Sequence, residues 1–352
     1  MKTVGIITYY VTNNYGTSLQ CYALKKVIEK LGNYEVKIIP HAIVDHIDNG
    51  FGGEELRKLY DERIQKFDVF TRETIGCKDE YIPVLTKENT PIFDYYITGS
   101  DTVWDTITMH DDDAFFLAFA PDNAVKISYA PSLAVADPTE LNRALFEKYI
   151  DKFDYLSIRE AYYIPFLKQF TEKEIYPVLD PTLLLEKEDY ENIEQRVEDE
   201  KYIFVYLIYD DTESVSYILN HANRLAIKYN LKVVHFVYNI PEYVFGERGK
   251  SFSFIGVEEF LGYVRNAEFV FTNSFHGTIF SIIYERQFYS YLRHDGKTKI
   301  RELLTELHID DRILNPSLGL EDMEAKIDYD AVNKILEQKR KESKEFLLKA
   351  LK

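Results

Sequence analysis

Residues 269–283 read FVFTNSFHGTIFSII, and this stretch decides the fold. The run Phe269–Thr272 has the aromatic and β-branched residues of a buried strand, and the apolar run that starts at Thr278 predicts a helix. A polar turn with a histidine beside a glycine joins them. Strand, turn and helix in this order form the unit that builds parallel sheets covered by helices.

The same alternation continues along the chain and predicts an α/β fold with doubly wound sheets. The run 202–209 is the strongest strand, since its residues are apolar without a break. The remaining expected strands are 4–9, 35–39, 95–98, 126–129, 155–158 and 232–237, and the expected helices include 213–229, 257–266 and 330–352.

A length of 352 residues suggests two domains. We place the boundary after a charged helical stretch, which gives an N-terminal domain over 1–197 and a C-terminal domain over 198–352 with a terminal helix. The glycine-containing stretch of about 41–90 is interpreted as an insertion or lid. Ligands of open parallel sheets bind beyond the carboxyl ends of the strands, so we expect the site in a cleft between the domains.

Composition excludes several function classes. The formal net charge of −17 argues against nucleic-acid binding and against an anionic membrane surface. The longest apolar stretch is far too short to span a bilayer, and the N-terminal run is too short for a signal peptide. The two cysteines fit a reducing compartment, and the histidines lack metal-ligand spacing. We therefore expect a cytoplasmic protein with no metal and no cofactor.

Polar residues follow the first and third expected strands. Asn14 and Gly16 lie before the first helix, where backbone can approach a ligand closely; a capping turn is the alternative. Ser100 and Asp101 can bind a polyol, and Asp101 can act as general base for a sugar hydroxyl. Trp104 can stack on a sugar face. Helix capping and core packing remain open for these three residues.

Two further candidates lie near the end of the N-terminal half. Arg159 follows the strand 155–158, where its guanidinium can clamp a phosphate or carboxylate, or form a salt bridge with Glu160. Asp180 precedes a proline that stiffens its turn, and a structural role is at least as well supported as a chemical one.

The turn after Phe269–Thr272 is the sharpest candidate. His276 lies at the start of a helix, where backbone N–H groups can hold a phosphate and the imidazole can donate a proton. Its polar neighbours are Asn273, Ser274 and Gly277. This setting is not typical of a core histidine, so we predict His276 as a catalytic acid.

Taken in order, these motifs resemble the polysaccharide pyruvyl transferase family from residue 3 to about residue 315. The motifs are Asn14-Tyr15-Gly16 with Leu19-Gln20, Gly99-Ser100-Asp101 with Trp104, Ser128 to Ser132, Ser157 to Glu160, Asp180-Pro181-Thr182 and Ser274-Phe275-His276-Gly277. The resemblance implies two Rossmann-like domains arranged as in GT-B glycosyltransferases. It also implies transfer of the pyruvyl group of phosphoenolpyruvate, a co-substrate, onto two sugar hydroxyls of a surface polysaccharide or its precursor, forming a ketal.

The resemblance also implies roles for the two domains. The N-terminal domain is expected to bind the acceptor, a glycan or lipid-linked saccharide, through the residues named after its first and third strands. Arg159 and the turn around His276 are expected to bind the donor. Characterised members have an arginine where this chain has Ser274, and Arg265, Arg293 or Lys297 are candidate substitutes. A GT-B-type glycosyltransferase using a nucleotide sugar and a non-catalytic glycan-binding relative remain open.

Overall fold

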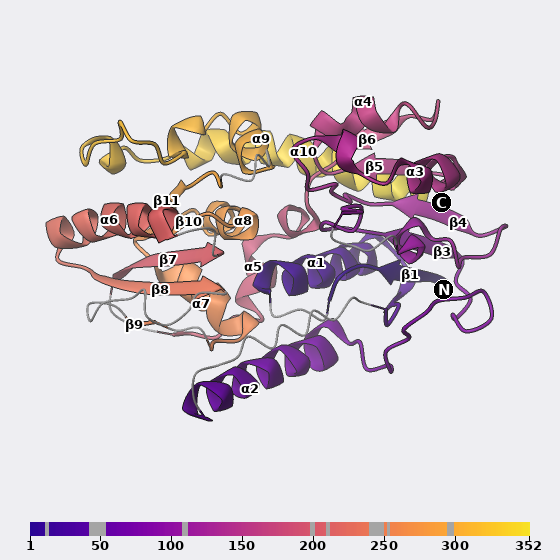
Figure 1. Cartoon of the computed structure of the whole chain (residues 1–352), viewed down its shortest axis with the longest axis horizontal. Helices are drawn as coiled ribbons and strands as arrows, with labels where there is room; N and C mark the ends of the chain where they lie inside the picture. The colour runs from indigo at the N-terminus through magenta and orange to yellow at the C-terminus, as the bar shows by residue number, and fades with distance from the viewer. Residues whose placement is uncertain are drawn as a thin grey trace. The chain divides into compact units, whose positions relative to one another are not determined.

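The computed structural model describes residues 1–10, 14–41, 54–107, 112–197, 201–208, 212–238, 250–251, 254–293 and 299–352 (Figure 1). The chain divides into two compact units. Unit 1 comprises Met1–Gly50, Phe67–Leu185 and Glu337–Lys352, and unit 2 comprises Phe51–Lys66 and Glu186–Leu336.

Unit 1 contains a parallel sheet with the strand order β2-β1-β3-β4. These strands are β1 (Lys2–Ile7), β2 (Tyr34–Ile38), β3 (Tyr95–Thr98) and β4 (Val125–Ser128). A bridge between Ile127 and Tyr155 joins β4 to the segment that leads into the parallel pair β5 (Leu156–Ile158) and β6 (Ile175–Pro177). Its helices are α1 (Tyr15–Leu31), α3 (Arg143–Tyr149) and α4 (Ile164–Leu167).

Unit 2 contains a second parallel sheet with the strand order β11-β10-β7-β8-β9. Its strands are β7 (Tyr202–Ile208), β8 (Lys232–Tyr238), β9 (Lys250–Ser251), β10 (Phe269–Thr272) and β11 (Gln287–Ser290). Its helices are α5 (Lys187–Glu191), α6 (Thr212–Tyr229), α7 (Val257–Asn266), α8 (Phe275–Ile283) and α9 (Lys299–Glu306). Two helices, α2 (Glu54–Val69) and α10 (Tyr329–Ala350), contain residues of both units.

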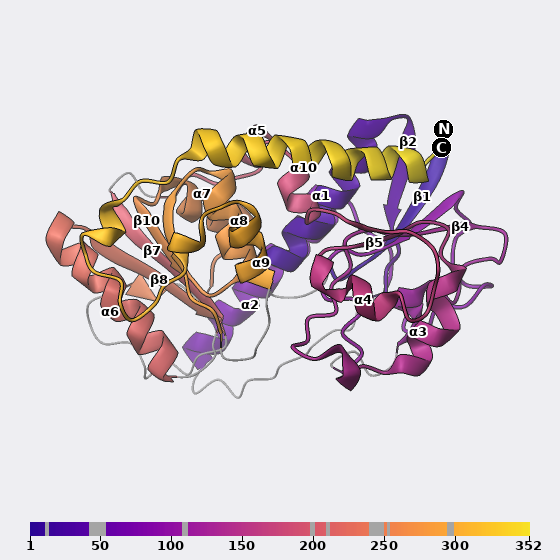
Figure 2. The same cartoon turned by 90° about the horizontal axis from the view of Figure 1, so that it is seen from above.

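Strand β7 is apolar without a break because both of its faces are buried. Ile203, Val205 and Leu207 share a core cluster with apolar residues of α6. On the other face, the ring of Tyr206 lies 5.0 Å from that of Phe260 on α7. Figure 2 shows α6 and α7 on opposite sides of this sheet. The predicted α/β class with helices on both faces of parallel sheets is confirmed.

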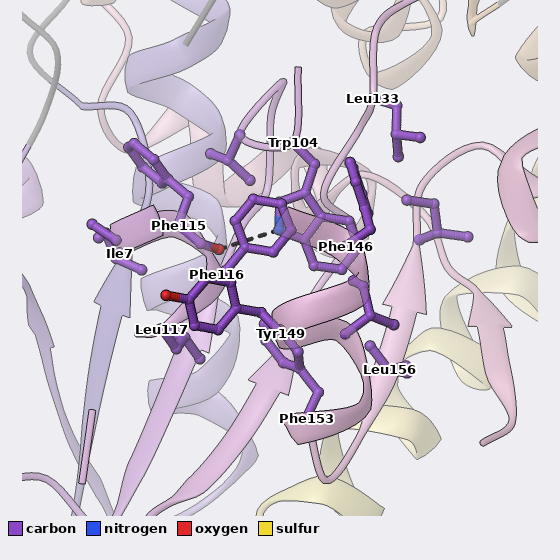
Figure 3. Packing of buried hydrophobic residues seen from close by; sticks show 14 of the residues in the cluster. Ile7, Trp104, Phe115, Phe116, Leu117, Leu133, Phe146, Tyr149, Phe153 and Leu156 are labelled. Atoms are coloured by element: carbon purple, nitrogen blue, oxygen red, sulfur yellow. Dashed lines mark hydrogen bonds between the residues drawn. The ribbon is translucent and has the colours of Figure 1, made fainter. Parts of the chain in front are cut away.

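The core of unit 1 is built around the single tryptophan of the chain. Trp104 has no exposed surface, and its indole stacks on Phe116 with ring centroids 5.7 Å apart (Figure 3). Its Nε1–H donates to the carbonyl of Phe115 at 3.2 Å, which satisfies the buried polar atom. Phe146 and Phe153 pack edge-on against the same indole. These contacts favour the alternative interpretation of Trp104 as a core residue, and stacking on a sugar stays a prediction that they do not support.

The compact units divide the chain differently from the predicted boundary at 197/198. Unit 2 begins at Glu186, and the last residues, 337–352, belong to unit 1. The reason is that the second half of α10 packs there: the ring of Phe346 lies 6.3 Å from Tyr129, and Ser343 Oγ accepts from the backbone N–H of Leu179 at 3.0 Å. The predicted insertion is also divided, since α2 begins in unit 2 and ends in unit 1.

His41, just beyond β2, is held by two acceptors. Its Nδ1 lies 2.7 Å from the carbonyl of Ile82 and its Nε2 lies 2.8 Å from Asp112 Oδ2. Only a doubly protonated imidazolium can donate to both, so the geometry favours the cation. Burial lowers the pKa of His41, but the bonds to Asp112 and Ile82 and the charge of Asp112 outweigh it and raise the pKa overall. His46 of the same stretch lies outside the described residues.

This pair predicts a pH-dependent contribution to stability. Because the folded pKa of His41 is raised, its contribution is fully present below the unfolded value of about 6.5 and is lost as the pH rises through the folded pKa. We expect His41→Gln to lower the free energy of unfolding by about 1.5–3 kcal/mol at pH 5.5 and by less at pH 9 in urea titrations. A cost that is equal at both pH values, or unaffected by a prior Asp112→Asn change, would contradict the charged pair.

Candidate functional site

The carboxyl ends of β3, β5 and β6 bring the predicted N-terminal candidates together in unit 1. Asp101 comes three residues after the end of β3 and adopts φ 69°, the left-handed region that few non-glycine residues occupy. A parallel bridge to Pro131 fixes its backbone against the segment after β4. The side chain is 8% exposed. Its carboxylate is thus held at the sheet edge by its backbone as well as by side-chain bonds.

Both oxygens of the Asp101 carboxylate accept hydrogen bonds. Oδ1 accepts from the backbone N–H of Thr102 at 2.9 Å, and Oδ2 accepts from Oγ1 of Thr17 at 2.8 Å. The first bond is a local turn bond. The second joins the loop after β3 to the first turns of α1, so Thr17 is a site residue that the sequence analysis did not select.

Arg159 lies directly after β5 and is enclosed by acids. Its Nε donates to Glu160 at 2.8 Å and its Nη1 to Asp180 at 2.9 Å, and all three side chains are under 5% exposed. Burial alone lowers the pKa of Arg159, but the charges of Glu160, Asp180 and Asp101 outweigh it and hold the pKa above its usual range. The geometry agrees with the salt bridge to Glu160 that the sequence offered as an alternative, and it adds Asp180 as a second partner.

Asp180 extends this ion-pair cluster to two neighbouring segments. Its Oδ1 accepts from the N–H and the hydroxyl of Thr182, and Asp180 thereby caps the turn Pro181–Leu184. Its Oδ2 lies 3.4 Å from Oγ of Ser100. Ser100 itself has no exposed surface and donates to the carbonyl of Ala130. The hydroxyl of Ser100 is thus used inside the fold, and a contact of Ser100 with the acceptor stays a prediction.

Asn14 and Gly16 form the capping turn that was the alternative interpretation. Oδ1 of Asn14 accepts from the N–H of Gly16 at 3.0 Å at the start of α1. Asn14 is partly exposed whereas Gly16 is buried. A role in acceptor binding stays a prediction for both.

In unit 2, the turn after β10 places His276 as the second residue of α8. Ser274 caps this helix: its Oγ accepts from the N–H of Gly277 at 3.3 Å, and its carbonyl accepts from Thr278. The side-chain amide of Asn273 bonds twice to Ile208, the last residue of β7: Nδ2 donates to the carbonyl of Ile208 and Oδ1 accepts from its N–H, both at 2.7 Å. Asn273 and Ser274 are 2% and 3% exposed. Their polar atoms hold the turn that carries His276, and donor binding by Asn273 and Ser274 stays a prediction.

Gly277 is required for close packing of α8 on the sheet. A Cβ built on it would lie 2.4 Å from Oγ1 of Thr272 and 3.0 Å from the ring of Tyr206. The absence of a side chain lets the first turn of α8 approach the ends of β10 and β7. The geometry therefore explains Gly277 by packing, and a contact with the donor stays a prediction.

Three cations were expected as substitutes for the family arginine. Arg265 is disfavoured by its place, since it lies in the last turn of α7, ahead of β10, and pairs there with Glu191 and Glu194. Arg293 lies three residues beyond β11, at the carboxyl edge of the sheet. Lys297 lies outside the described residues. The structure adds Lys299, which the sequence did not single out: its Nζ lies 5.7 Å from the ring centroid of Phe275, the neighbour of His276.

The two sheet edges belong to different units. Asn14, Asp101 and Arg159 lie in unit 1, and His276 lies in unit 2. The expectation that these four residues share one cleft stays a prediction.

No grouping of three or more His, Cys, Asp or Glu side chains suited to a metal ion occurs within the described ranges. In the same part of the chain, no helix combines the length and the apolar character needed to cross a bilayer.

Comparison with protein families decides the relationship that the motifs suggested. The family model described as polysaccharide pyruvyl transferase matches residues 14–295. The chain belongs to this family. No curated protein sequence matches it.

Solved structures agree with the fold. An MnaA–UDP complex from S. aureus aligns with a TM-score of 0.55 at 13% identity, covering 98% of this chain and 91% of that one. The UDP-GlcNAc 2-epimerase of Neisseria meningitidis, bound to UDP-GlcNAc, aligns with a TM-score of 0.53 at 11% identity, covering 100% of this chain and 99% of that one. The Methanocaldococcus jannaschii UDP-GlcNAc 2-epimerase, in complex with UDP-GlcNAc and UDP, aligns with a TM-score of 0.51 at 16% identity, with the same coverage of 100% of this chain and 99% of that one. At such identities the likeness shows the fold alone, and it confirms the predicted GT-B-like class.

The packing of Gly277 can be tested by adding one methyl group. We expect Gly277→Ala to lower the free energy of unfolding by about 1–3 kcal/mol, because the new Cβ overlaps Thr272. Urea titration measures this change. Gly319→Ala is the matched control: its Cβ would meet the exposed Asp322 side chain, which can move, so a change within about 0.5 kcal/mol is expected. Equal costs for both variants would contradict the packing argument.

The ion-pair cluster predicts a large stability cost for losing its cation. Arg159→Met leaves Glu160 and Asp180 buried without a counter-charge, and we expect a loss of about 3–5 kcal/mol in the free energy of unfolding. A matched control is Arg143→Met, since Arg143 bonds Gln169 at the surface of the same unit. If Arg159→Met is as stable as the control while binding of anions weakens, Arg159 is a ligand and not a scaffold residue.

Proposed function

We propose that this protein transfers the pyruvyl group of phosphoenolpyruvate to two hydroxyls of a sugar in a polysaccharide or its precursor, forming a ketal and releasing phosphate. The observation that carries the proposal is the place of His276. In a chain of this family, the imidazole lies in the first turn of α8, at the carboxyl end of β10, where parallel sheets bind ligands.

The residues supply the proton transfers that this reaction needs. His276 donates a proton to C3 of phosphoenolpyruvate, which turns the methylene into a methyl group and leaves a cation at C2. The first hydroxyl oxygen bonds to C2 and gives its proton to Asp101. The bond between C2 and the phosphate oxygen then breaks, and its electron pair leaves with the phosphate. The oxygen of the second hydroxyl bonds to C2 and closes the ketal, and its proton is taken up by the departing phosphate.

The donor's negative charges have to be balanced by cations other than Arg159. That guanidinium already faces Glu160 and Asp180, and Asp101 adds a third carboxylate to the edge of unit 1. An edge with this excess of acids suits a neutral polyol and opposes a phosphate. We therefore assign the acceptor to the edge of unit 1 and the donor to the turn around His276, with Lys299 and Arg293 as its cations.

The proposed activity is tested by the product released. We expect purified protein with phosphoenolpyruvate and a saccharide acceptor to release inorganic phosphate only when both are present, and the product to show the methyl resonance of a pyruvate ketal by NMR. Release of a nucleoside diphosphate from a nucleotide sugar would instead indicate a glycosyltransferase. This alternative is kept because Ser274 stands where characterised members of the family have an arginine. Saccharide binding without turnover would indicate a non-catalytic relative.

The role of His276 predicts a large loss of turnover with little loss of stability. General acid catalysis contributes about 10²–10⁴-fold, so His276→Gln should reduce kcat by that factor while the melting temperature stays near that of the unmodified protein. His221→Gln is the matched control, since His221 is a buried histidine of the same unit that bonds the carbonyl of Tyr217 within α6. A destabilised but active His276→Gln would end the assignment.

A further inference from the structure

We infer that Thr17 is a positioning residue for Asp101, holding the carboxylate in the orientation that accepts the proton of the acceptor hydroxyl. The inference rests on the proposed function, because it takes Asp101 as the general base. The family relationship does not supply it; it comes from the bond between Oγ1 of Thr17 and Oδ2 of Asp101 at 2.8 Å. This bond joins residues 84 positions apart in the chain.

The donor of this bond is itself fixed. Thr17 is 6% exposed and lies in the first turn of α1. Its carbonyl accepts from Nε2 of Gln20 at 3.0 Å. The same nitrogen lies 2.9 Å from both Oγ1 of Thr8 and the carbonyl of Tyr9, and Thr8 in turn donates to the carbonyl of Ser100. One buried glutamine thus holds both the helix turn that carries Thr17 and the loop that carries Asp101.

The two bonds to Asp101 leave its carboxylate with a defined face. The N–H of Thr102 occupies one oxygen from the loop side, and the Thr17 hydroxyl occupies the other from the helix side. Each carboxylate oxygen has two acceptor sites, so one bond to each still leaves capacity for a substrate hydroxyl. Without the Thr17 bond, the carboxylate would be free to rotate about its last torsion, which is broad and roughly two-fold.

The charged neighbours do not provide this orientation. Arg159 attracts Asp101 electrostatically, but its Nε and Nη1 donate to Glu160 and Asp180. Glu160 and Asp180 repel the Asp101 carboxylate and donate no hydrogen bond to it as anions. Asp105, on the same loop, accepts from the N–H of Ile107. The Thr17 hydroxyl is therefore the side-chain donor that fixes Asp101 in the described part of this edge.

The test separates the positioning role from the proposed function. Asp101→Asn is measured first with phosphoenolpyruvate and a saccharide acceptor. If turnover persists, Asp101 is not the base, and the proposed role of Asp101 fails together with the inference. If turnover is lost, Thr17→Val is measured, since valine keeps the shape of threonine and lacks the hydroxyl.

We expect Thr17→Val to lower kcat by about 10- to 100-fold with KM for the acceptor nearly unchanged, because one hydrogen bond to a charged group is removed. Thr17→Ser should restore most of the activity, and Thr17→Val should add nothing in the Asp101→Asn background. Thr171→Val is the matched control: Thr171 donates to Asp151 in the same unit, ahead of β6, and its loss should leave kcat unchanged. An unchanged kcat in Thr17→Val, failure of rescue by serine, or an equal loss in the control overturns the inference.

Discussion

The buried contact of Arg159 with Asp180 is the interaction on which the edge of unit 1 depends. It joins the residue after β5 to the segment after β6, and Asp180 also reaches Ser100 after β3 and caps the turn 181–184. Two buried charges are costly to remove from water, so this contact persists only with its surrounding hydrogen bonds intact. The loops that carry the candidate residues are therefore held by one network of charges.

The partners of Arg159 in this network change how an arginine at the end of a strand is interpreted. A guanidinium in such a place can clamp a phosphate, and the family resemblance suggests that use. In this chain its Nε and Nη1 face carboxylates, so its charge is compensated within the fold. The same edge then carries an excess of acidic groups, which is unfavourable for an anionic ligand.

The fold could be predicted from the sequence because the pattern of apolar residues along each strand and helix agrees with which of its faces are buried. Strand β7 is apolar throughout since α6 and α7 cover its two faces, and the turn 273–277 marks where a strand meets a helix. Whereas the salt bridge of Arg159 with its neighbour Glu160 could be predicted, the packing partners of Trp104 and the contact of Arg159 with Asp180 could not. Both depend on residues distant in the chain, Phe116 and Asp180, and no local pattern announces such contacts.

The turn after β10 shows what local sequence can define: the predicted strand, turn and helix are confirmed, and a role of the turn in binding or catalysis stays a prediction. Local sequence identified this strand, turn and helix, but it could not show which residues of the turn are engaged in holding its structure. Asn273, Ser274 and Gly277 are explained by bonds to Ile208, capping of α8 and packing on Thr272. His276 stays the predicted acid of this turn, and Lys299, whose Nζ lies 5.7 Å from the ring centroid of Phe275, is a nearby charge that the spacing did not reveal.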